Sequence, residues 1–370
     1  MNLSFWERES WFNNVDYTIV GSGIVGLMCA IRLREKDANS KIVVLEKGLL
    51  PNGASTKNAG FGCFGSISEL LEDLKTHTEE EVVSLVKQRV EGLQLLRSML
   101  GDEKIDYQEH GGYELFTSND NVLYEECVNN LTRINKLLFS IFNKDLYTLE
   151  DNAFGFHGVE EKVIFNNGEG QIDTGRMMSA LLKLAQSKGI FILNGMTVNS
   201  YKEGAEGVAV VTAQNTFFTK KLFIATNGFA STLGLSEVKP ARAQVLITHP
   251  IPELKVKGTF HLDKGYYYFR NINNRILLGG GRNLDIQGEE TMVMSQTALI
   301  QNELERLLAE VILPHTPYTI DHRWSGIMGV GIQKKPIVKK ISKHTYCGVR
   351  LGGMGVAIGS TIGKNLADLI

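Results

Sequence analysis

The chain has 370 residues, of which 43% are hydrophobic, and its 39 basic residues nearly balance its 41 acidic residues. The resulting net charge of -2 gives no global field that would attract nucleic acid or an anionic membrane, and the length predicts about two domains. No apolar stretch reaches the roughly 20 residues of a membrane span, and charged residues interrupt the N-terminal segment early, so we expect a cytoplasmic protein with a short extension at 1–13.

The first predicted elements are a strand, a glycine turn and a helix. The apolar run 17–20 leads into the turn and then into the apolar residues 27–33; the turn consists of Gly21, Ser22, Gly23, Ile24, Val25 and Gly26. Gly21 allows a sharp turn, Gly23 lets the backbone approach a pyrophosphate, and Gly26 lets the helix pack closely on the strand. The helix N-terminus offers free N–H groups to phosphates. The pattern predicts a dinucleotide site.

A second apolar run, 41–45, follows at the spacing of a strand–helix–strand unit and ends in Glu46, 20 residues beyond Gly26. A carboxylate at this position accepts both ribose hydroxyls of an adenosine and repels a 2′-phosphate. The ligand is therefore expected to be FAD or NAD rather than NADP. Lys47 beside Glu46, and Val198 much later in the chain, are included in the predicted cofactor site.

Residues 53–62 read Gly-Ala-Ser-Thr-Lys-Asn-Ala-Gly-Phe-Gly. This segment resembles the G-A-S-x-x-N-x-G segment of the FAD-dependent D-amino-acid oxidase superfamily. Small residues with a few hydrogen-bonding side chains let a loop lie against a pyrophosphate and a flavin edge without clashes. The resemblance implies FAD contacts from Ala54, Ser55, Thr56, Asn58, Ala59 and Gly60.

Two later segments repeat the resemblance. Residues 222–228 look like the family's second strand near the dinucleotide, with Thr226, Asn227 and Gly228 at its end. Residues 346–357 resemble the C-terminal strand, glycine turn and helix that bring N–H groups to the pyrimidine end of the flavin. The implied contacts there are Gly352, Gly353, Met354, Gly355 and Val356. The segments 240–245 and 323–326 also resemble family elements, so that the likeness covers nearly the whole chain.

The expected fold combines α/β and α+β parts: a Rossmann-like FAD-binding domain interleaved with an antiparallel-sheet substrate domain. We assign 14–80, 165–235 and 320–370 to the FAD-binding domain, and 81–164 and 236–319 to the substrate-binding domain. Apolar periodicity predicts helices over 79–100, 121–143, 172–188 and about 295–312. Strands are predicted over 105–118, 190–226 and 242–282.

The resemblance implies oxidation of a C–N bond. A hydride leaves the carbon next to an amine and reaches flavin N5, and water hydrolyses the resulting imine; the partner is a small amine or amino acid, with O2 as a candidate acceptor. This chemistry requires no nucleophile or metal, and no such motif stands in the sequence. The four cysteines are scattered, which argues against a metal or a disulfide framework.

Candidate substrate ligands come from the second domain and the C-terminal turn. Tyr266, Tyr268 and Arg270 share one face of a predicted strand, which allows a carboxylate clamp, with a solvated edge arginine as the alternative. Arg350 precedes the flavin turn and either binds a substrate carboxylate or flavin O4, or forms a structural ion pair. Met328 stands near the position where glycine-oxidase-like members carry an arginine. Either another arginine takes over, or the substrate lacks an α-carboxylate.

Noncovalent FAD is expected, because Asn58 and the segment 327–329 stand where related enzymes carry a flavin-linking histidine or cysteine. A thioether from Cys63 is the alternative. Lys264 is either an oxygen-activating lysine over the flavin or a surface lysine.

Two other functions remain open at this stage. One is a flavin oxidase that acts on a tRNA side chain, for which Lys334, Lys335, Lys339, Lys340 and Lys343 supply only a short basic stripe. The other is a non-catalytic flavoprotein. No nucleic-acid partner is expected, and the oligomeric state is left open.

Overall fold

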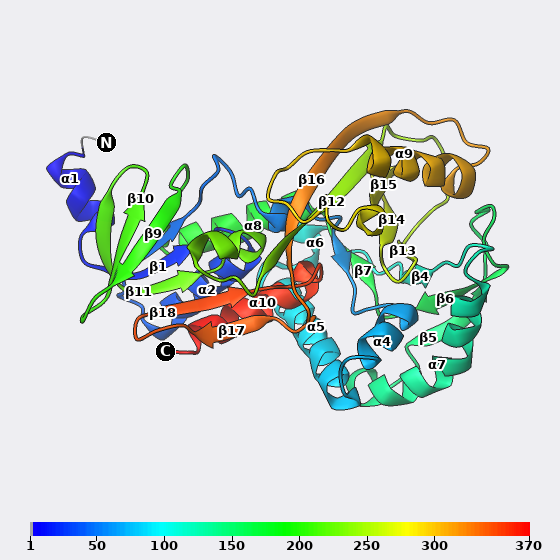
Figure 1. Ribbon diagram of the computed structural model, residues 1–370, viewed down its shortest axis with the longest axis horizontal. Helices are drawn as coiled ribbons and strands as arrows, with labels where there is room; N and C mark the ends of the chain where they lie inside the picture. The colour runs from blue at the N-terminus through cyan, green and yellow to red at the C-terminus, as the bar shows by residue number, and fades with distance from the viewer. Residues whose placement is uncertain (1–2) are drawn as a thin grey trace.

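The computed structural model describes residues 3–370, and its elements form two halves that lie side by side in Figure 1. Each half contains an eight-stranded sheet. In the first sheet the order is β17-β18-β11-β1-β2-β8, with β10 paired to β11 and β9 paired to β10. Its strands are β1 (Val15–Val20), β2 (Ile42–Leu45), β8 (Phe191–Leu193), β9 (Val198–Glu203), β10 (Val208–Thr212), β11 (Thr216–Ile224), β17 (Ile337–Lys340) and β18 (Thr345–Val349).

The centre of the first sheet is parallel, because β1 runs parallel to both β2 and β11, and β11 runs parallel to β18. Buried parallel strands read as continuous apolar runs, and all four residues of β2 are buried. This arrangement confirms the Rossmann-like half that the sequence predicts. It brings β18, from the end of the chain, next to β11 and two strands from β1.

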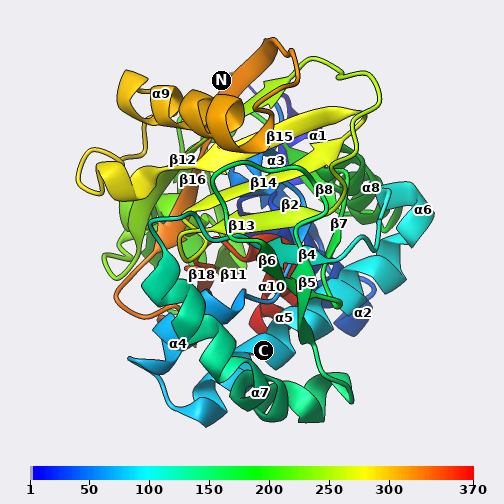
Figure 2. The ribbon, with the colours of Figure 1, turned by 90° about the vertical axis from the view of Figure 1, so that its right-hand side faces the viewer.

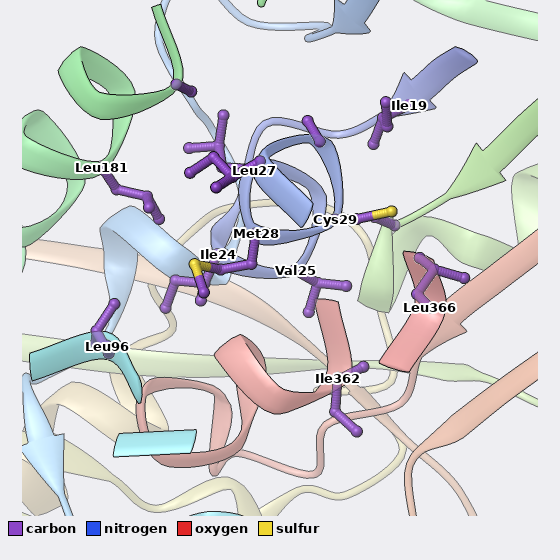
Figure 3. Close-up of a cluster of buried hydrophobic side chains, with 14 of the residues drawn as sticks. Ile19, Ile24, Val25, Leu27, Met28, Cys29, Leu96, Leu181, Ile362 and Leu366 are labelled. Carbon is purple, nitrogen blue, oxygen red and sulfur yellow. The ribbon is translucent and has the colours of Figure 1, made fainter. Parts of the chain in front are cut away.

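The helix α2 (Ile24–Lys36) lies at the centre of the largest apolar core, between α8 (Thr174–Ser187), α5 (Glu79–Leu100) and α10 (Gly355–Ala367). Figure 3 shows Leu96, Leu181 and Ile362 converging on it from these three helices. Small residues permit the close crossings: a Cβ on Gly363 would lie 2.6 Å from the Val25 carbonyl oxygen. The last helix of the chain is thus packed against the first turn of the dinucleotide motif.

The second sheet has the order β16-β12-β15-β14-β13-β4-β6-β5. Its strands are β4 (Gly112–Glu114), β5 (Tyr147–Asp151), β6 (Lys162–Asn166), β12 (Lys239–Thr248), β13 (Thr259–Leu262), β14 (Tyr267–Ile272), β15 (Arg275–Gly280) and β16 (Ile320–Val330). Apart from the parallel contact of β13 with β4, its neighbouring strands are antiparallel.

One face of the second sheet is covered by α9 (Ala298–Leu307), whose π-helical continuation is η4 (Leu308–Ile312) (Figure 2). The core beneath it contains Phe260 and Phe269, whose rings stack at 4.5 Å between centroids. At the other end lie α4 (Ile67–Leu74) and α7 (Asn121–Phe142), which together with α5 form a separate apolar cluster.

The remaining elements are short: α1 (Phe5–Glu7), η1 (Arg8–Phe12), α3 (Ala54–Lys57), α6 (Asp102–Ile105), η2 (Asn227–Leu233), η3 (Arg282–Leu284), and the paired strands β3 (Phe61–Gly62) and β7 (Gly170–Gln171). The predicted extension at 1–13 contains α1 and η1, and its first two residues lie outside the described part of the chain. Within residues 3–370, no helix combines the length and apolarity needed to cross a membrane.

The predicted helices 79–100 and 121–143 are confirmed as α5 and α7, whereas the predicted strand region 105–118 contains only the short β4 within the second sheet. The segment 320–370, assigned to one domain by the sequence, contributes to both sheets. Its first strand, β16, pairs with β12 along ten residues of the second sheet, and only the part after Val330 joins the first. The domain division otherwise stays a prediction.

Candidate active site

A cavity of about 880 Å³ is lined by residues from both halves of the chain. Many of the predicted site residues lie in its wall: Gly21, Gly23, Ile24, Val25, Glu46, Lys47, Ala54, Ser55, Asn58, Ala59, Val198, Thr226, Asn227, Tyr266, Tyr268, Met328, Gly352, Gly353, Met354, Gly355 and Val356. The predicted residues outside the lining are Ser22, Gly26, Thr56, Gly60, Gly228, Arg270 and Arg350.

The glycine turn between β1 and α2 has the geometry that its sequence predicts. Gly21 has a φ of 106°, in a region that side-chain-bearing residues rarely adopt, and a Cβ on Gly26 would lie 1.9 Å from the Gly21 carbonyl oxygen. At the start of α2, the Ile24 N–H donates to Ser55 Oγ at 3.0 Å. The helix N-terminus and α3 therefore meet at the cavity wall, where the Ser55 hydroxyl, which accepts from Ile24, keeps its proton to donate to a ligand.

The carboxylate of Glu46 is held from two sides. Ser22 Oγ donates to Oε2 at 2.7 Å, and the Gly48 N–H donates to Oε1 at 2.9 Å. Glu46 is only 5% exposed but lines the cavity, so the lone pairs that remain can accept ribose hydroxyls. The Nζ of Lys47 lies 3.3 Å from the centroid of the Phe229 ring, and burial lowers the pKa of this lysine.

Asn58 shapes the loop that follows α3. Its Nδ2 donates to the carbonyl oxygens of Ala54 and Ser55, and its Oδ1 accepts from the Gly60 N–H and from Thr174 Oγ1, both at 2.8 Å. These contacts use its polar atoms to fix the path of the loop. Thr56 also acts on the loop, because its hydroxyl donates to the Pro51 carbonyl at 2.7 Å.

The turn before α10 is joined to the end of β11 by Asn227. Its Oδ1 accepts from the N–H groups of Arg350 and Leu351, at 3.0 and 3.2 Å. Gly352 and Gly353 follow with φ values of 58° and 88°, and they lead to the N-terminus of the 13-residue α10. A loop of glycines that opens onto a helix N-terminus can approach a flavin closely and present N–H groups to it.

Thr226 gives a separate indication that this part of the cavity holds a polar ligand. Its Oγ1 is buried and has no hydrogen-bond partner anywhere in residues 3–370, yet the residue lines the cavity. Buried hydroxyls are normally paired, so a ligand is the natural partner for this one. The glycine turns, the carboxylate of Glu46 and this hydroxyl together fit a dinucleotide cofactor.

The part of the cavity formed by β14 of the second sheet has an aromatic wall. Tyr266 and Tyr268 line the cavity, whereas Tyr267 points to the opposite face and packs in the core below α9. Gly279 makes room for Tyr268, because a Cβ on Gly279 would lie 2.8 Å from its hydroxyl oxygen. Burial raises the pKa of Tyr268 to about 12, so its hydroxyl stays protonated at neutral pH and can donate a hydrogen bond.

Arg270 does not reach the cavity, although it shares a strand face with Tyr268. It is 2% exposed, and its Nη1 donates to the carbonyl oxygens of Gly60 and Ile172 at 3.0 and 2.7 Å. Burial lowers the pKa of this arginine to about 10. Arg270 lies two residues beyond Tyr268 on β14, and its guanidinium joins this strand to the backbone at Gly60 and Ile172. Its contacts are therefore structural and fix the loop that contains Gly60.

Arg350 is also outside the lining. Its Nε donates to the Lys335 carbonyl at 3.0 Å, and its side chain lies against Gly331. Arg282, which sequence reasoning missed, lines the cavity instead, with its guanidinium carbon 5.1 Å from the centroid of the Tyr266 ring. Among the residues that the structure describes, Arg282 forms no ion pair with an acidic side chain.

Sequence reasoning missed the two carboxylates that α4 places in the cavity wall, whereas Lys264, which it considered as an oxygen-activating lysine over the flavin, also lines the cavity. Glu69 and Glu72 on α4 line the cavity, and Glu72 lies 3.3 Å from the Nζ of Lys264. Lys334, also in the lining, lies 2.5 Å from Asp73. Lys264 is thus tied to α4 by an ion pair. The amphipathic pattern of α4 indicates which of its carboxylates lie on the polar face of the helix. It does not indicate that this face borders the cavity.

His261, on β13, is a further residue of the lining that was missed. It is 5% exposed, and its Nε2 lies 3.0 Å from Oε2 of Glu169. Burial acts to lower the pKa of His261, but the charge and hydrogen bond of Glu169 outweigh it and raise the pKa to about 9. In the sequence, this histidine interrupts an apolar strand between Phe260 and Leu262. Such a polar residue in an apolar strand could have indicated a functional side chain.

Cys63 lies in the cavity wall, 3.5 Å from the sulfur of Met354. Burial raises its pKa well above the ordinary value, so the thiol is protonated and weakly nucleophilic. Across the described part of the chain, no group of three or more histidine, cysteine or acidic side chains is placed to hold a metal ion.

The first sheet is Rossmann-like, with a glycine turn and a buried carboxylate after its second strand, and the second sheet lines the same cavity. This combination is typical of a two-part flavoprotein oxidoreductase. A family model confirms this class. The DAO model, described as FAD dependent oxidoreductase, matches residues 16–369, and the chain belongs to this family. FAD is accordingly its cofactor.

Similar proteins span nearly the whole chain. A gamma-glutamylputrescine oxidoreductase of Escherichia coli is 24% identical over 380 residues, covering 96% of this chain and 83% of that protein. A probable oxidoreductase OrdL of Haemophilus influenzae is 21% identical, with the same coverage of 96% and 83%. Among solved structures, glycine oxidase from Geobacillus kaustophilus has a TM-score of 0.76 at 20% identity, covering 96% of this chain and 94% of its own. This structural likeness shows that the fold is shared.

Proposed function

We propose that this protein oxidises the C–N bond of a small amine or amino acid. The observation that carries the proposal is the continuity of the cavity: the glycine turns, Glu46 and the N-terminus of α10 open into the same space as Tyr266, Tyr268 and Arg282. The similar proteins whose names state a substrate include a gamma-glutamylputrescine oxidoreductase, two glycine oxidases, an iminodiacetate oxidase and an L-proline dehydrogenase. Each of these named substrates contains an amine or amino-acid nitrogen, which supports the proposal.

Bound FAD would supply the acceptor for the two electrons and the hydrogen removed from the C–N unit. Glu46 would bind the adenosine ribose, and the N–H groups at the start of α2 would face the pyrophosphate. Thr226 and the glycine turn before α10 would hold the flavin end. We propose that this binding is noncovalent, since Cys63 is a buried, protonated thiol in contact with Met354.

The second sheet would bind and orient the substrate. The Tyr268 hydroxyl is a donor of fixed protonation state, and Phe61 packs edge-on against its ring at 5.6 Å between centroids, which excludes water from that side. Met328 adds an apolar surface. Arg282 replaces Arg270 and Arg350 as the candidate arginine for a substrate carboxylate, because it lies in the cavity wall and has no acidic partner within residues 3–370.

The direct test is anaerobic bleaching of the bound flavin. The FAD-loaded protein is mixed with a panel of amines, D- and L-amino acids and 2-hydroxy acids, and absorbance near the flavin maximum is followed before air is admitted. We expect amines or amino acids to bleach the flavin, at rates that rise with pH as the substrate amine loses its proton. Bleaching by a hydroxy acid with no response to any amine would refute the substrate class.

The role of Arg282 is tested with the first active amino acid from that panel. A hydrogen bond to a charged group contributes roughly 1.5–3 kcal/mol, so Arg282→Leu, which removes a half-buried guanidinium from the cavity wall, should raise KM by about tenfold or more. Arg350→Leu is the matched control, since its guanidinium contacts the Lys335 carbonyl outside the cavity. Equal effects of the two substitutions would contradict the assignment.

A further inference from the structure

His261, Tyr268 and Gly279 form a row across three neighbouring strands of the second sheet. His261 is paired with Tyr268 in the register of β13 and β14, and Tyr268 is paired with Gly279 in that of β14 and β15. The Tyr268 ring leans over Gly279, where a Cβ would lie 2.7 Å from the ring. The ring therefore lies toward β15, on the side away from His261.

Glu169 fixes the orientation of the imidazole from behind the cavity wall. Its Oε2 accepts from Thr259 Oγ1 at 2.8 Å and lies 3.0 Å from His261 Nε2, while its Oε1 accepts from Asn166 Nδ2 at 3.1 Å. Glu169 is 2% exposed. A buried carboxylate with this many donors holds its partner imidazole in one position.

The other ring nitrogen of His261 is left for a ligand. Nδ1 makes no hydrogen bond with any residue of the range 3–370, and the residue lines the cavity. With a pKa of about 9, the imidazole carries a proton on both nitrogens at neutral pH, so that Nδ1–H is a donor on a positively charged ring. The acidic groups that act on it are Glu169, Glu69 on α4 and Glu114 on β4.

We propose that His261 is a specificity-determining residue that binds an anionic group of the substrate through Nδ1–H. The inference rests on the proposed function and narrows it to amines that also carry a carboxylate. Two cationic side chains then flank Tyr268, with His261 on β13 to one side and Arg282, just after β15, to the other. A carboxylate is bound most tightly where charged donors are fixed in advance and shielded from water.

Spectral titration of the FAD-loaded protein tests this without turnover. Acetate and acetamide have nearly the same shape but differ in charge, and binding of either next to the flavin is followed in the visible spectrum. We expect His261→Gln to raise the Kd of acetate at least tenfold and to leave that of acetamide within twofold. Gln keeps a donor for Glu169 but removes the positive charge. His249→Gln, at an exposed histidine outside the lining, is the matched control.

Two further variants separate binding from misfolding. His261→Lys returns a positive charge to the site and should restore acetate binding to within threefold of the wild type. Glu169→Gln removes the main cause of the raised pKa, so the Kd of acetate should become pH-dependent between pH 6 and 8, whereas that of the wild type stays flat over this range.

An acetate Kd in His261→Gln within twofold of the wild type would overturn the proposal, as would equal losses for acetate and acetamide, or a wild type that binds no acetate. Failure of the proposed function is recognised separately, because it appears as a flavin that no amine can bleach while these titrations still report on His261.

Discussion

The two ends of the cavity are built from different parts of the polypeptide. At the dinucleotide end, backbone groups dominate: the turn at Gly21, the start of α2 and the glycines before α10 bring main-chain atoms to the ligand. At the substrate end, side chains of separate elements meet, among them Glu69 of α4, His261 of β13 and Arg282 after β15. We therefore expect FAD binding to depend on the backbone conformation of these turns. Under the proposed function, the choice of substrate depends on side chains that can be replaced without altering the fold.

The largest effect is expected when a single methyl group is added in the glycine turn between β1 and α2. Gly26→Ala places a Cβ 1.9 Å from the Gly21 carbonyl oxygen, so α2 must move away from the turn. We expect loss of bound FAD and a large fall in the melting temperature, measured by the ratio of visible to ultraviolet absorbance and by thermal denaturation. Gly204→Ala is the control, since Gly204 lies outside the cavity lining and an added Cβ there comes no nearer than 3.7 Å to another atom. Full retention of FAD by Gly26→Ala would refute this account of the turn.

Glu46 is the exception at the dinucleotide end, because it contributes through its side chain. Glu46→Gln removes the negative charge that would accept the ribose hydroxyls, and a hydrogen bond to a charged group contributes about 2 kcal/mol. We therefore expect the Kd of FAD, measured by titrating apoprotein, to rise roughly thirtyfold. Glu35→Gln, on the exposed end of α2, should leave it unchanged. Equal FAD affinity in both variants would show that Glu46 does not contact the cofactor.

At the substrate end, the His261–Glu169 pair predicts a pH-dependent stability. The pKa of His261 is about 9 in the folded protein against 6.5 for the ordinary side chain, so the stabilisation is complete below about pH 6.5 and is lost as the pH rises through about 9. The shift corresponds to a contribution on the order of 3 kcal/mol. Between pH 6.5 and 9, the melting temperature of the wild type should fall more steeply than that of His261→Gln. Parallel curves would contradict the charged pair.

The smallest effect is expected at Cys63. Its thiol lies in the cavity wall but is buried and protonated, so Cys63→Ser should keep the full flavin absorbance. Acid precipitation should release intact FAD from both proteins. Flavin fluorescence that migrates with the denatured wild-type polypeptide, and not with the variant, would show a thioether.

The sequence predicts well those features that lie within one contiguous segment. The turn around Gly21 and the carboxylate of Glu46 follow from local spacing, and the glycines before α10 follow from the resemblance of their segment to a family element; all line the cavity. The helix α5 also follows from its periodicity, with the predicted bounds 79 and 100. Local patterns contain this information because the chain itself sets the distances.

Features that depend on distant partners could not be predicted in the same way. Strand periodicity places Tyr268 and Arg270 on one face, but it does not show that Gly60 and Ile172 surround the arginine. The role of His261 depends on Glu169, which lies 92 residues earlier in the chain. Likewise, only the antiparallel register with β12 reveals that β16 belongs to the second sheet. In each case the decisive contact is tertiary.

The packing of α10 against α2 has a consequence for synthesis. The glycine motif emerges from the ribosome early, whereas β18 and α10, which pair with its sheet and cover its helix, are made much later. Because domains fold as units during translation, the nascent chain can assemble its cofactor pocket only once the final helix is free. FAD can therefore bind in full only after α10 has been made, and we expect a truncation that removes α10 to abolish flavin binding.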